Sequence, residues 1–338
     1  MTTADLVPGP VADPAPRTRR APARWLTGLC WLLVVPGLAW AAVRVAGLER
    51  GPAVQLIAFT PYVAAWALLP LGLALALRRW WAAGVAALTA VTLVGLVAPR
   101  ALPDPQPAPG GPPLRVLTAN LLAGAADPGA LVALVRSHRV DVLAVQEFTP
   151  NAEAALDRMG LAALLPYRQL NPEPGTTGSA LYSRFPLSDG GVRRNGGGFT
   201  QAYATVWPEG APPVLVESVH PLAPSALSTL PDWRADLAAQ PPASPDGPLR
   251  ILAGDFNATL DHAPLRDLLD TGYVDAAAAV GAGLTGTWGP YDGDLIPPVT
   301  IDHVLVDPRI AVTRVAVRPL PGSDHRPVLA ELTLPRKG

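Results

Sequence analysis

The segment Ala253–Thr259 (AGDFNAT) follows the apolar run Leu249–Leu252. We interpret the run as a buried strand that carries Asp255 and Asn257 to its C-terminal end. Because side chains alternate along a strand, these two residues are expected to point the same way and Phe256 into the core. A carboxylate that can orient or deprotonate water, beside an amide that can donate to a phosphoryl oxygen, suits a phosphate ester. Taken alone, the segment is equally typical of a strand-to-turn junction.

Composition and charge limit the classes of function. The chain has 338 residues, 49% of them hydrophobic, and a formal net charge of -1, which is enough for one enzyme domain and a further segment. Residues 1–110 contain nine arginines and four acidic residues, whereas residues 111–338 contain 17 basic and 23 acidic residues. An acidic domain lacks the basic surface that grips duplex DNA, which disfavours a nuclease. Cys30 is the single cysteine, so the second part has no disulfide, cysteine-based zinc cluster or cysteine nucleophile.

The first hundred residues predict a membrane anchor. Residues 1–24 are rich in proline, alanine and arginine, which predicts a disordered cytoplasmic tail. Three apolar runs follow within an anchor of residues 25–98, each near the ~20 residues that cross a bilayer as a helix: 25–45, 54–77 and 80–97. Arginines in the tail and at positions 78 and 79 favour the cytoplasmic side, so the chain beyond residue 98 is expected outside the cell.

A proline-rich stretch separates this anchor from an α/β domain. Residues 99–113 contain seven prolines and two glycines, which predicts a semi-rigid spacer. From 114 to 338, short β-rich runs alternate with amphipathic stretches, and several runs are apolar throughout, as in sheets covered on both faces. Strands are predicted at 114–118, 140–145, 180–182, 202–206, 214–219, 249–252, 299–306, 312–317 and 328–334, and helices at 128–137, 150–159, 224–239 and 263–270.

Polar residues recur where these predicted strands end or begin. Each motif alone has an ordinary structural explanation as a turn, a cap or a satisfied core residue. Six of them at the same kind of position in one domain indicate a functional site. The motifs are Thr118-Ala119-Asn120, Gln146-Glu147, Ser218-Val219-His220, Gly254-Asp255-Phe256-Asn257, Ile301-Asp302-His303 and Ser323-Asp324-His325.

In this order the motifs resemble the signature of the endonuclease/exonuclease/phosphatase family, which includes DNase I-like nucleases, sphingomyelinases and inositol-polyphosphate 5-phosphatases. The resemblance covers residues 114–334. It implies a four-layer α/β sandwich, in which two packed β-sheets are flanked by helices, here preceded by three transmembrane helices. It also implies a metal site: Glu147 would be the principal ligand of Mg²⁺ or Mn²⁺, with Asn120 and Asp324 completing or supporting it.

The same resemblance assigns the catalytic roles. Asp255 would position or activate the attacking water, while Asn257 and His220 would hold phosphoryl oxygens. His325 would act on the scissile phosphate, oriented by a hydrogen bond to Asp302, a pairing that favours a protonated imidazole.

Two other residues are expected to have no catalytic role. His303 follows Asp302 on the opposite strand face, so we interpret it as structural. Arg184 matches an arginine near the family's site and could bind phosphate, although a surface salt bridge is the alternative.

The anchor and this domain together resemble the VanJ-type teicoplanin-resistance membrane proteins. This implies a lipid-linked phosphate or pyrophosphate, such as that of an undecaprenyl carrier, as the substrate. We therefore expect a multi-pass, membrane-anchored, Mg²⁺-dependent phosphoesterase with an extracellular catalytic domain and no obligate protein partner. One alternative is an extracellular nuclease, which requires a basic groove beside Asp255 and His325. Another is a non-catalytic envelope protein that binds an antibiotic or a lipid intermediate.

Overall fold

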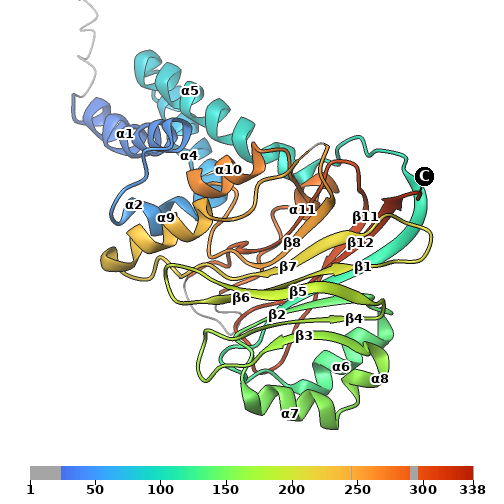
Figure 1. Cartoon of the computed structure of the whole chain (residues 1–338). Helices are drawn as coiled ribbons and strands as arrows, with labels where there is room; N and C mark the ends of the chain where they lie inside the picture. Colours follow the sequence, from blue (N-terminus) through green and yellow to red (C-terminus); the bar gives the residue numbers. More distant parts are fainter. Residues whose placement is uncertain (1–23, 245, 290–295, 338) are drawn as a thin grey trace, which may run out of the picture.

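Two six-stranded β-sheets face each other in the computed structural model, which describes residues 24–244, 246–289 and 296–337 (Figure 1). The strands are β1 (Gly110–Asn120), β2 (Val142–Gln146), β3 (Tyr167–Asn171), β4 (Ser179–Ser183), β5 (Leu187–Arg194), β6 (Thr200–Val206), β7 (Val214–Val219), β8 (Leu249–Asp255), β9 (Val274–Asp275), β10 (Asp302–Val306), β11 (Ala311–Val317) and β12 (Val328–Pro335). One sheet has the order β11-β12-β1-β2-β4-β3 and the other β5-β6-β7-β8-β10-β9. β1 pairs with β2, and β7 with β8, in parallel, whereas all other neighbours are antiparallel.

Apolar side chains fill both faces of the central strands. Along β1 and β2, Val116 and Val142 point between the sheets, whereas Leu117 and Leu143 point to the outer face of their sheet. This alternation follows from the two-residue period of a strand. Each such fully buried side chain contributes roughly 1.5–3 kcal/mol to folding. The central strands therefore read as apolar throughout because helices cover their outer faces.

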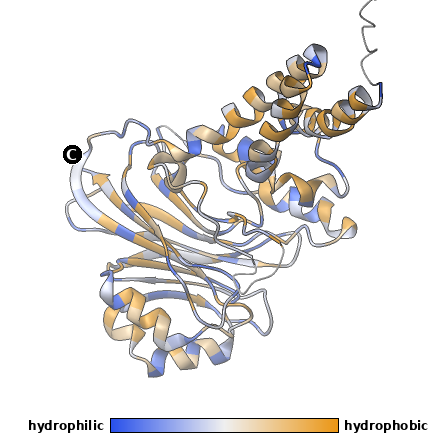
Figure 2. Cartoon of the chain, turned by 180° about the vertical axis from the view of Figure 1, so that it is seen from behind, coloured by the Kyte–Doolittle hydropathy of each residue, from blue (hydrophilic) through white to orange (hydrophobic). Residues whose placement is uncertain are grey.

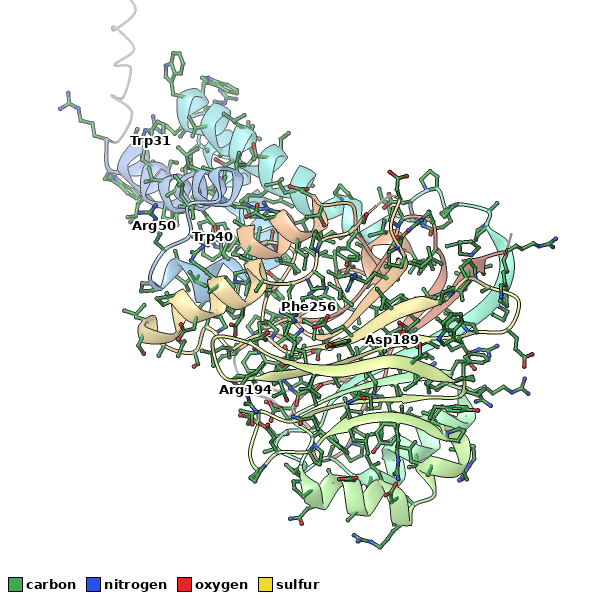
Figure 3. The ribbon with its side chains drawn as sticks, viewed as in Figure 1. Trp31, Trp40, Arg50, Asp189, Arg194 and Phe256 are labelled. Atoms are coloured by element: carbon green, nitrogen blue, oxygen red, sulfur yellow. The ribbon has the colours of Figure 1, made fainter. Side chains whose placement is uncertain are left out.

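Helices on the outer faces complete a DNase I-like sandwich. The first sheet is covered by α6 (Pro128–Ser137), α7 (Pro150–Arg158) and α8 (Leu161–Leu164), and the second by α9 (Leu230–Ala238) and α10 (Ala263–Leu269). Two short helices, η2 (Leu227–Thr229) and α11 (Ala276–Ala279), lie in connections. Phe256 packs under α9 and α10 in the interior of the domain (Figure 3). The predicted sandwich of two sheets flanked by helices is confirmed.

The apolar region before the sandwich forms helices α1 (Arg24–Ala46), α2 (Ala53–Ile57), α3 (Thr60–Trp66), α4 (Leu68–Ala76), α5 (Trp80–Val97) and η1 (Ala98–Ala101). Two helices, Arg24–Ala46 and Trp80–Ala101, are long and apolar enough to cross a membrane, a property that signal sequences and buried core helices share. Figure 2 shows the hydrophobic character of this bundle. Most of the predicted tail, residues 1–23, lies outside the described residues.

The middle apolar run differs from the prediction. Residues 54–77 were expected to form one spanning helix, but they form α2, α3 and α4. Pro61 lies in the first turn of α3, and Pro70 lies in α4. Proline has no backbone N–H to donate one turn back, so Pro61 cannot bond to Ile57, nor Pro70 to Trp66. The helix is interrupted near both points, whereas α1 continues through its Pro36.

The segment after α5 also differs from the predicted spacer. β1 begins at Gly110, inside the expected linker, and pairs with the end of β12. Further back, the backbone N–H of Asp104 donates to Ala279 at 2.9 Å, and the side chain of Gln106 bonds to both Ala279 and Val312. The prolines prevent helix formation but leave the segment extended, and extended chain can lie along the domain. The stretch therefore packs against the sandwich and does not hold it away from the helices.

Candidate active site

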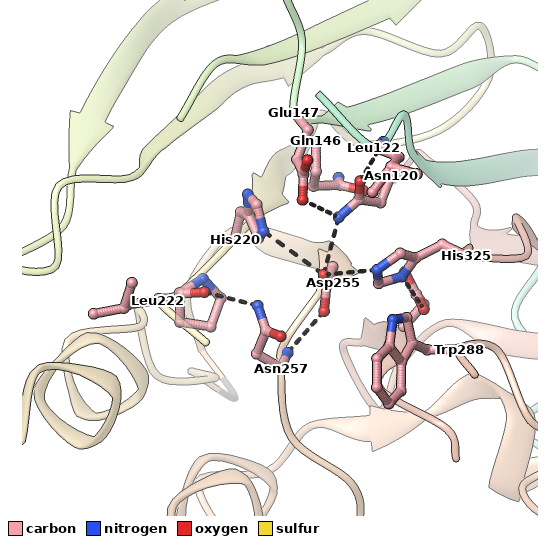
Figure 4. Close-up of polar contacts among 12 residues, drawn as sticks. Asn120, Leu122, Gln146, Glu147, His220, Leu222, Asp255, Asn257, Trp288 and His325 are labelled. Atoms are coloured by element: carbon pink, nitrogen blue, oxygen red, sulfur yellow. Dashed lines mark hydrogen bonds and ion pairs between the residues drawn. The ribbon is translucent and has the colours of Figure 1, made fainter. Parts of the chain in front are cut away.

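The six polar motifs meet at one edge of the sandwich (Figure 4). Parallel strands bring their C-terminal ends together, so the ends of β1 and β2 meet in one sheet and those of β7 and β8 in the other. β10 and β12 run antiparallel to β8 and β1, and their first residues therefore lie at the same edge. The residues brought there are Asn120, Glu147, His220, Asp255, Asp302 and His325.

Asp255 lies at the centre of these contacts and is only 1% exposed. Asn120 Nδ2 donates to Asp255 Oδ2 at 3.0 Å, and the backbone N–H of Asn257 donates to Oδ1 at 2.8 Å. The Nε2 atoms of His220 and His325 each lie 3.6 Å from Oδ2. Burial raises the pKa of Asp255, and the charge of His325 opposes that rise. Asp255 is therefore a more basic carboxylate than one in water, and it is held in one orientation.

Glu147 is held just beyond Asn120. Asn120 Nδ2 also donates to Glu147 Oε1 at 3.1 Å, and the backbone N–H of Ala123 donates to Oε2 at 2.6 Å. Burial raises the pKa of Glu147. Its backbone has φ of 55°, a left-handed conformation that costs energy for residues other than glycine and that is common at functional sites. The turn after β2 aims this carboxylate back toward the edge of the sandwich.

His325 forms a pair with Asp302. Its Nδ1 lies 3.0 Å from Asp302 Oδ2, while Nε2 faces Asp255. Burial alone would lower the pKa of His325, but Asp302 and Asp255 outweigh it and raise the pKa to about 10. The imidazole is therefore doubly protonated at neutral pH, and it holds a positive charge beside the carboxylate of Asp255.

His220 has the opposite protonation state. It is buried, and burial lowers its pKa to about 4 despite the neighbouring Asp255. Its ring and that of Phe199 form a T-shaped pair with centroids 4.7 Å apart, and Nδ1 has no hydrogen-bond partner among the described residues. A neutral His220 can offer one N–H donor without adding charge.

Asn257 reaches the site differently from the prediction. We expected strand alternation to align it with Asp255, but β8 ends at Asp255 and Asn257 has φ of 49°. The bond from Asn257 N to the carboxylate of Asp255 makes a tight turn, as Asp side chains often do two residues before a backbone N–H. The Asn257 amide then donates to Pro221 O at 3.1 Å.

Asp324 lies at the rim of the site. Its side chain is 44% exposed and lies 3.9 Å from His325 Nε2. Trp288 Nε1 donates to its Oδ2 at 2.9 Å. The role of Asp324 as a metal ligand stays a prediction. Trp288, which the motif order does not indicate, joins the site because the Thr287–Trp288 backbone pairs with Val299 and lies beside His325.

A buried polar link under the site joins the two sheets. Gln146 Nε2 donates to Ser218 Oγ at 2.8 Å, and Ser218 in turn donates to Val145 O. On its other side, Gln146 accepts from Thr118 Oγ1 at 3.1 Å. The glutamine of the Gln-Glu motif therefore fixes the position of one sheet relative to the other, a role that motif spacing alone does not reveal.

Arg184 lies away from the site. β4 runs antiparallel to β2, so Arg184, which follows the end of β4, is beside the beginning of β2. There its Nε donates to Asp141 Oδ1 at 3.0 Å and its Nη2 to Val140 O at 3.0 Å. The prediction of a phosphate contact is wrong because Glu147 follows the opposite end of β2, and the salt bridge is what forms.

Arg184→Gln is therefore expected to change kcat/KM less than about twofold, since the residue touches no group in the site. Steady-state hydrolysis of bis(p-nitrophenyl) phosphate measures the effect. A loss of tenfold or more would restore Arg184 to the substrate-binding residues.

His303 is buried on the opposite face of β10 from Asp302. Its Nδ1 lies 2.8 Å from Asp275 Oδ2, and its Nε2 lies 3.0 Å from Ala258 O. Both partners are acceptors, so the ring needs two N–H donors and is charged. Burial would lower the pKa of His303, but Asp275 outweighs it and raises the pKa above the usual 6.5.

His303→Gln is expected to lower the free energy of unfolding by about 2–4 kcal/mol at pH 6, because it removes two charge-assisted hydrogen bonds. The folded-state pKa is raised, so this stabilisation is complete below pH 6.5 and is lost as the pH rises through the folded-state value. Denaturant unfolding at pH 6 and pH 9 measures the difference, with His138→Gln as the control. Equal destabilisation at both pH values would contradict a charged His303.

The donor set suits a hard divalent cation. Glu147, Asp255 and Asp302 are buried carboxylates around one imidazolium, so the ionised site has an excess of negative charge. Ligand atoms of Asp255, Asp302 and His325 lie within 4.8 Å of one another, so this group could bind a metal. A doubly protonated His325, however, has no lone pair to give a metal. The oxygen donors of Glu147 and Asn120 are the better candidates, and oxygen ligands favour Mg²⁺ or Mn²⁺.

Solved structures share this fold. An endonuclease/exonuclease/phosphatase from Beutenbergia cavernae matches over 66% of this chain and 72% of its own, with a TM-score of 0.54 and 18% identity. Truncated Caenorhabditis elegans TDP2 matches over 65% of this chain and 97% of its own, with a TM-score of 0.52 and 18% identity. The protein SmcL matches over 67% and 99%, with a TM-score of 0.51 and 17% identity. A search of curated proteins found no match. At these identities the structural likeness establishes the fold.

The sandwich and its acidic, histidine-containing edge define a DNase I-like hydrolase of phosphoester bonds. A family model, described as the Endonuclease/Exonuclease/phosphatase family, matches residues 117–325, which is more than half of the chain. The chain belongs to this family.

Proposed function

We propose that the chain is a Mg²⁺-dependent phosphoesterase that acts at the outer face of a membrane on a lipid-linked phosphate or pyrophosphate. The observation that carries the proposal is the convergence of Glu147, Asp255 and His325 at the edge where both parallel strand pairs end. Asn120 Nδ2 bonds to both Glu147 and Asp255. His325 Nε2 lies 3.6 Å from Asp255, so a basic carboxylate, a fixed imidazolium and an oxygen donor lie side by side.

The residues divide the work of an in-line attack on phosphorus. Asp255 has lone pairs beyond those that its neighbours occupy, so it can orient a water and take its proton. His325 holds a proton on Nε2 and donates it as a hydrogen bond to a phosphoryl oxygen, where negative charge develops. Asp302 keeps that imidazole charged and in one orientation. Neutral His220 and the amide of Asn257 donate to the remaining oxygens.

Glu147 and Asn120 would hold the metal ion, and Asp324 is a further candidate ligand. Bound there, Mg²⁺ would supply a positive charge that polarises a phosphoryl oxygen and stabilises the leaving group.

The N-terminal helices support a membrane location. Large apolar residues on them are exposed, among them Trp81, Val91 and Leu32, whereas a helix packed in water would turn such residues inward. Arg78 and Arg79 lie between α4 and α5, and Glu49 contacts the sandwich at the other end of the bundle. This arrangement supports a cytoplasmic 78–79 turn and an extracellular sandwich, with α3 and α4 as the middle passage and α2 packed against the sandwich.

Labelling with a membrane-impermeant maleimide tests the orientation. In a Cys30→Ser background, Ser188→Cys in the sandwich is expected to react in intact cells and Arg78→Cys only after lysis. Reaction of Arg78→Cys alone in intact cells would reverse the proposed topology.

The substrate is tested with detergent-solubilised protein, Mg²⁺ or EDTA, and His325→Ala as the blank. The panel contains undecaprenyl pyrophosphate, a phosphoinositide, sphingomyelin and DNA. Metal-dependent turnover of a lipid phosphate supports the proposal. Turnover of DNA alone would favour a tethered nuclease, and lipid binding without any turnover would favour a binding protein.

A further inference from the structure

A buried ion pair joins the N-terminal helices to the sandwich. Asp261 is fully buried, and both of its carboxylate oxygens are bound by Arg100, at 2.6 and 2.7 Å. Arg44, from the last turn of α1, donates from Nε to Asp261 Oδ1 at 2.6 Å and from Nη2 to Leu260 O at 3.1 Å. Burial would raise the pKa of Asp261, but the two guanidiniums outweigh it and hold the pKa below its usual value.

Asp261 belongs to the same loop as Asn257. Residues 256–262 run between β8 and α10 without helix or strand, so contacts to other segments must fix their positions. Near the site, Trp233 Nε1 donates to Asn257 O at 3.0 Å, and His303 bonds to Ala258 O. At the far end, the contacts come from α1 and η1. Contacts thus fix the loop at both of its ends, and the contacts at the end near Asp261 come from the N-terminal helices.

His262, the residue after Asp261, also bonds to the N-terminal helices. Thr259 N–H donates to His262 Nδ1 at 2.8 Å, so His262 Nε2 carries the proton and donates to Val54 O at 2.9 Å. The next backbone N–H, that of Ala263, donates to Glu49 Oε1 at 2.6 Å. Consecutive residues of the loop therefore bond to α1, α2 and the turn between them.

Two other loops of the site touch the same helices. Gln55 donates to Pro224 O at 2.8 Å, in the segment that follows His220. Tyr62 donates to Pro298 O at 2.7 Å, in the segment that leads to Asp302. Three of the connections that carry site residues are thus bound by helices that precede the sandwich in sequence.

We propose that Arg44 and Arg100 are positioning residues, which act through Asp261 to fix the 256–262 loop and with it Asn257. The N-terminal helices are then part of the catalytic apparatus as well as a membrane anchor. The nature of the contact supports this role. Apolar packing would join two parts of a protein at least as stably as a buried ion triad, whose desolvation offsets much of its attraction, but the triad admits only one geometry.

The test uses the full chain in detergent with Mg²⁺ and bis(p-nitrophenyl) phosphate as the probe. Arg100→Lys keeps the charge and loses the two-point contact with Asp261. Asn257→Ala removes the group that is positioned, and the double variant asks whether the two act together. Arg168→Lys, in the exposed pair with Asp157, is the matched control.

Arg100→Lys is expected to lower kcat about tenfold with little change in KM, and Asn257→Ala about 10²-fold. In the Asn257→Ala background, Arg100→Lys is expected to add almost nothing, because the arginine acts through that residue. An equal factor in both backgrounds, or no loss relative to Arg168→Lys, would overturn the proposal.

Hydrogen exchange gives a readout that needs no turnover. The amides of residues 257–263 are expected to exchange faster in Arg100→Lys than in Arg168→Lys, with the β8 amides unchanged. Unchanged loop exchange would overturn the positioning role even in an active enzyme. If the wild type does not cleave the probe, the proposed activity fails while exchange still decides the role of the triad. If Arg100→Lys does not fold, Arg44→Lys, which retains the Arg100 pair, takes its place in both measurements.

Discussion

Replacing His325 with alanine is expected to lower kcat for bis(p-nitrophenyl) phosphate by about 10³-fold, with a much smaller change in KM. The imidazolium is a fixed cation that faces Asp255 at the centre of the site, and it would be most important where phosphoryl charge develops. Its loss also removes the ion pair between His325 and the buried carboxylate of Asp302. Steady-state kinetics at saturating Mg²⁺ measures both constants.

The pH dependence follows from the same pair. Because the raised pKa of His325 is about 10, wild-type kcat should stay level through neutral pH and fall above about pH 10. Asp302→Asn removes the main cause of the raised pKa, so it should move that alkaline limb to lower pH. His138→Ala, at the end of α6, serves as the control. If His325→Ala retained more than a tenth of the activity, the imidazolium would not be a catalytic group.

Glu147→Gln is expected to weaken Mg²⁺ binding by about 10²-fold and to lower kcat by a similar factor at limiting metal. The change keeps the size of the side chain and an oxygen for the Ala123 N–H, but it removes the negative charge. Calorimetric titration with Mn²⁺ and the dependence of rate on Mg²⁺ concentration measure the two effects.

Glu331→Gln is the matched control, because Glu331 forms an exposed ion pair with Arg314 on β11. EDTA should abolish turnover by the wild type and by this control. Unchanged metal affinity in Glu147→Gln would move the metal to the neighbouring group Asp255, Asp302 and His325.

The buried strands could be predicted because their residues face apolar layers on both sides. β3, β5 and β9 were missed. All three lie at sheet edges: RQLN ends β3, SDGG lies within β5, and β9 has only two residues. An edge strand pairs with a neighbour on one side only and is less buried. Its sequence therefore need not be apolar, and the apolar pattern that predicts a strand is absent. The break in the middle apolar run was missed for another reason. A proline inside a hydrophobic stretch is compatible with both a kinked and an interrupted helix.

The site residues that lie at strand ends could be predicted from the sequence. Motifs at the ends of β1, β2, β7 and β8 had to converge once those strands paired in parallel. The prediction that Arg184 binds phosphate was wrong because the position of Arg184 depends on the direction of β4, which the local sequence does not determine. The pairs of Asp261 with Arg44 and Arg100 span 217 and 161 residues, and no local pattern connects them.

The two sheets have similar strand arrangements. Each has a central parallel pair, β1 with β2 and β7 with β8, flanked by antiparallel partners. The ends of these parallel pairs carry different chemistry: Asn120 and Glu147 lie at the end of one pair, and His220 and Asp255 lie at the end of the other. In the proposed mechanism, one sheet contributes the metal ligands and the other contributes the base that activates water. The distance between the two sheets would then set the size of the phosphate group that fits between these residues. Substitutions of the small side chains between the sheets would change this distance, and with it the substrate preference, without altering a site residue.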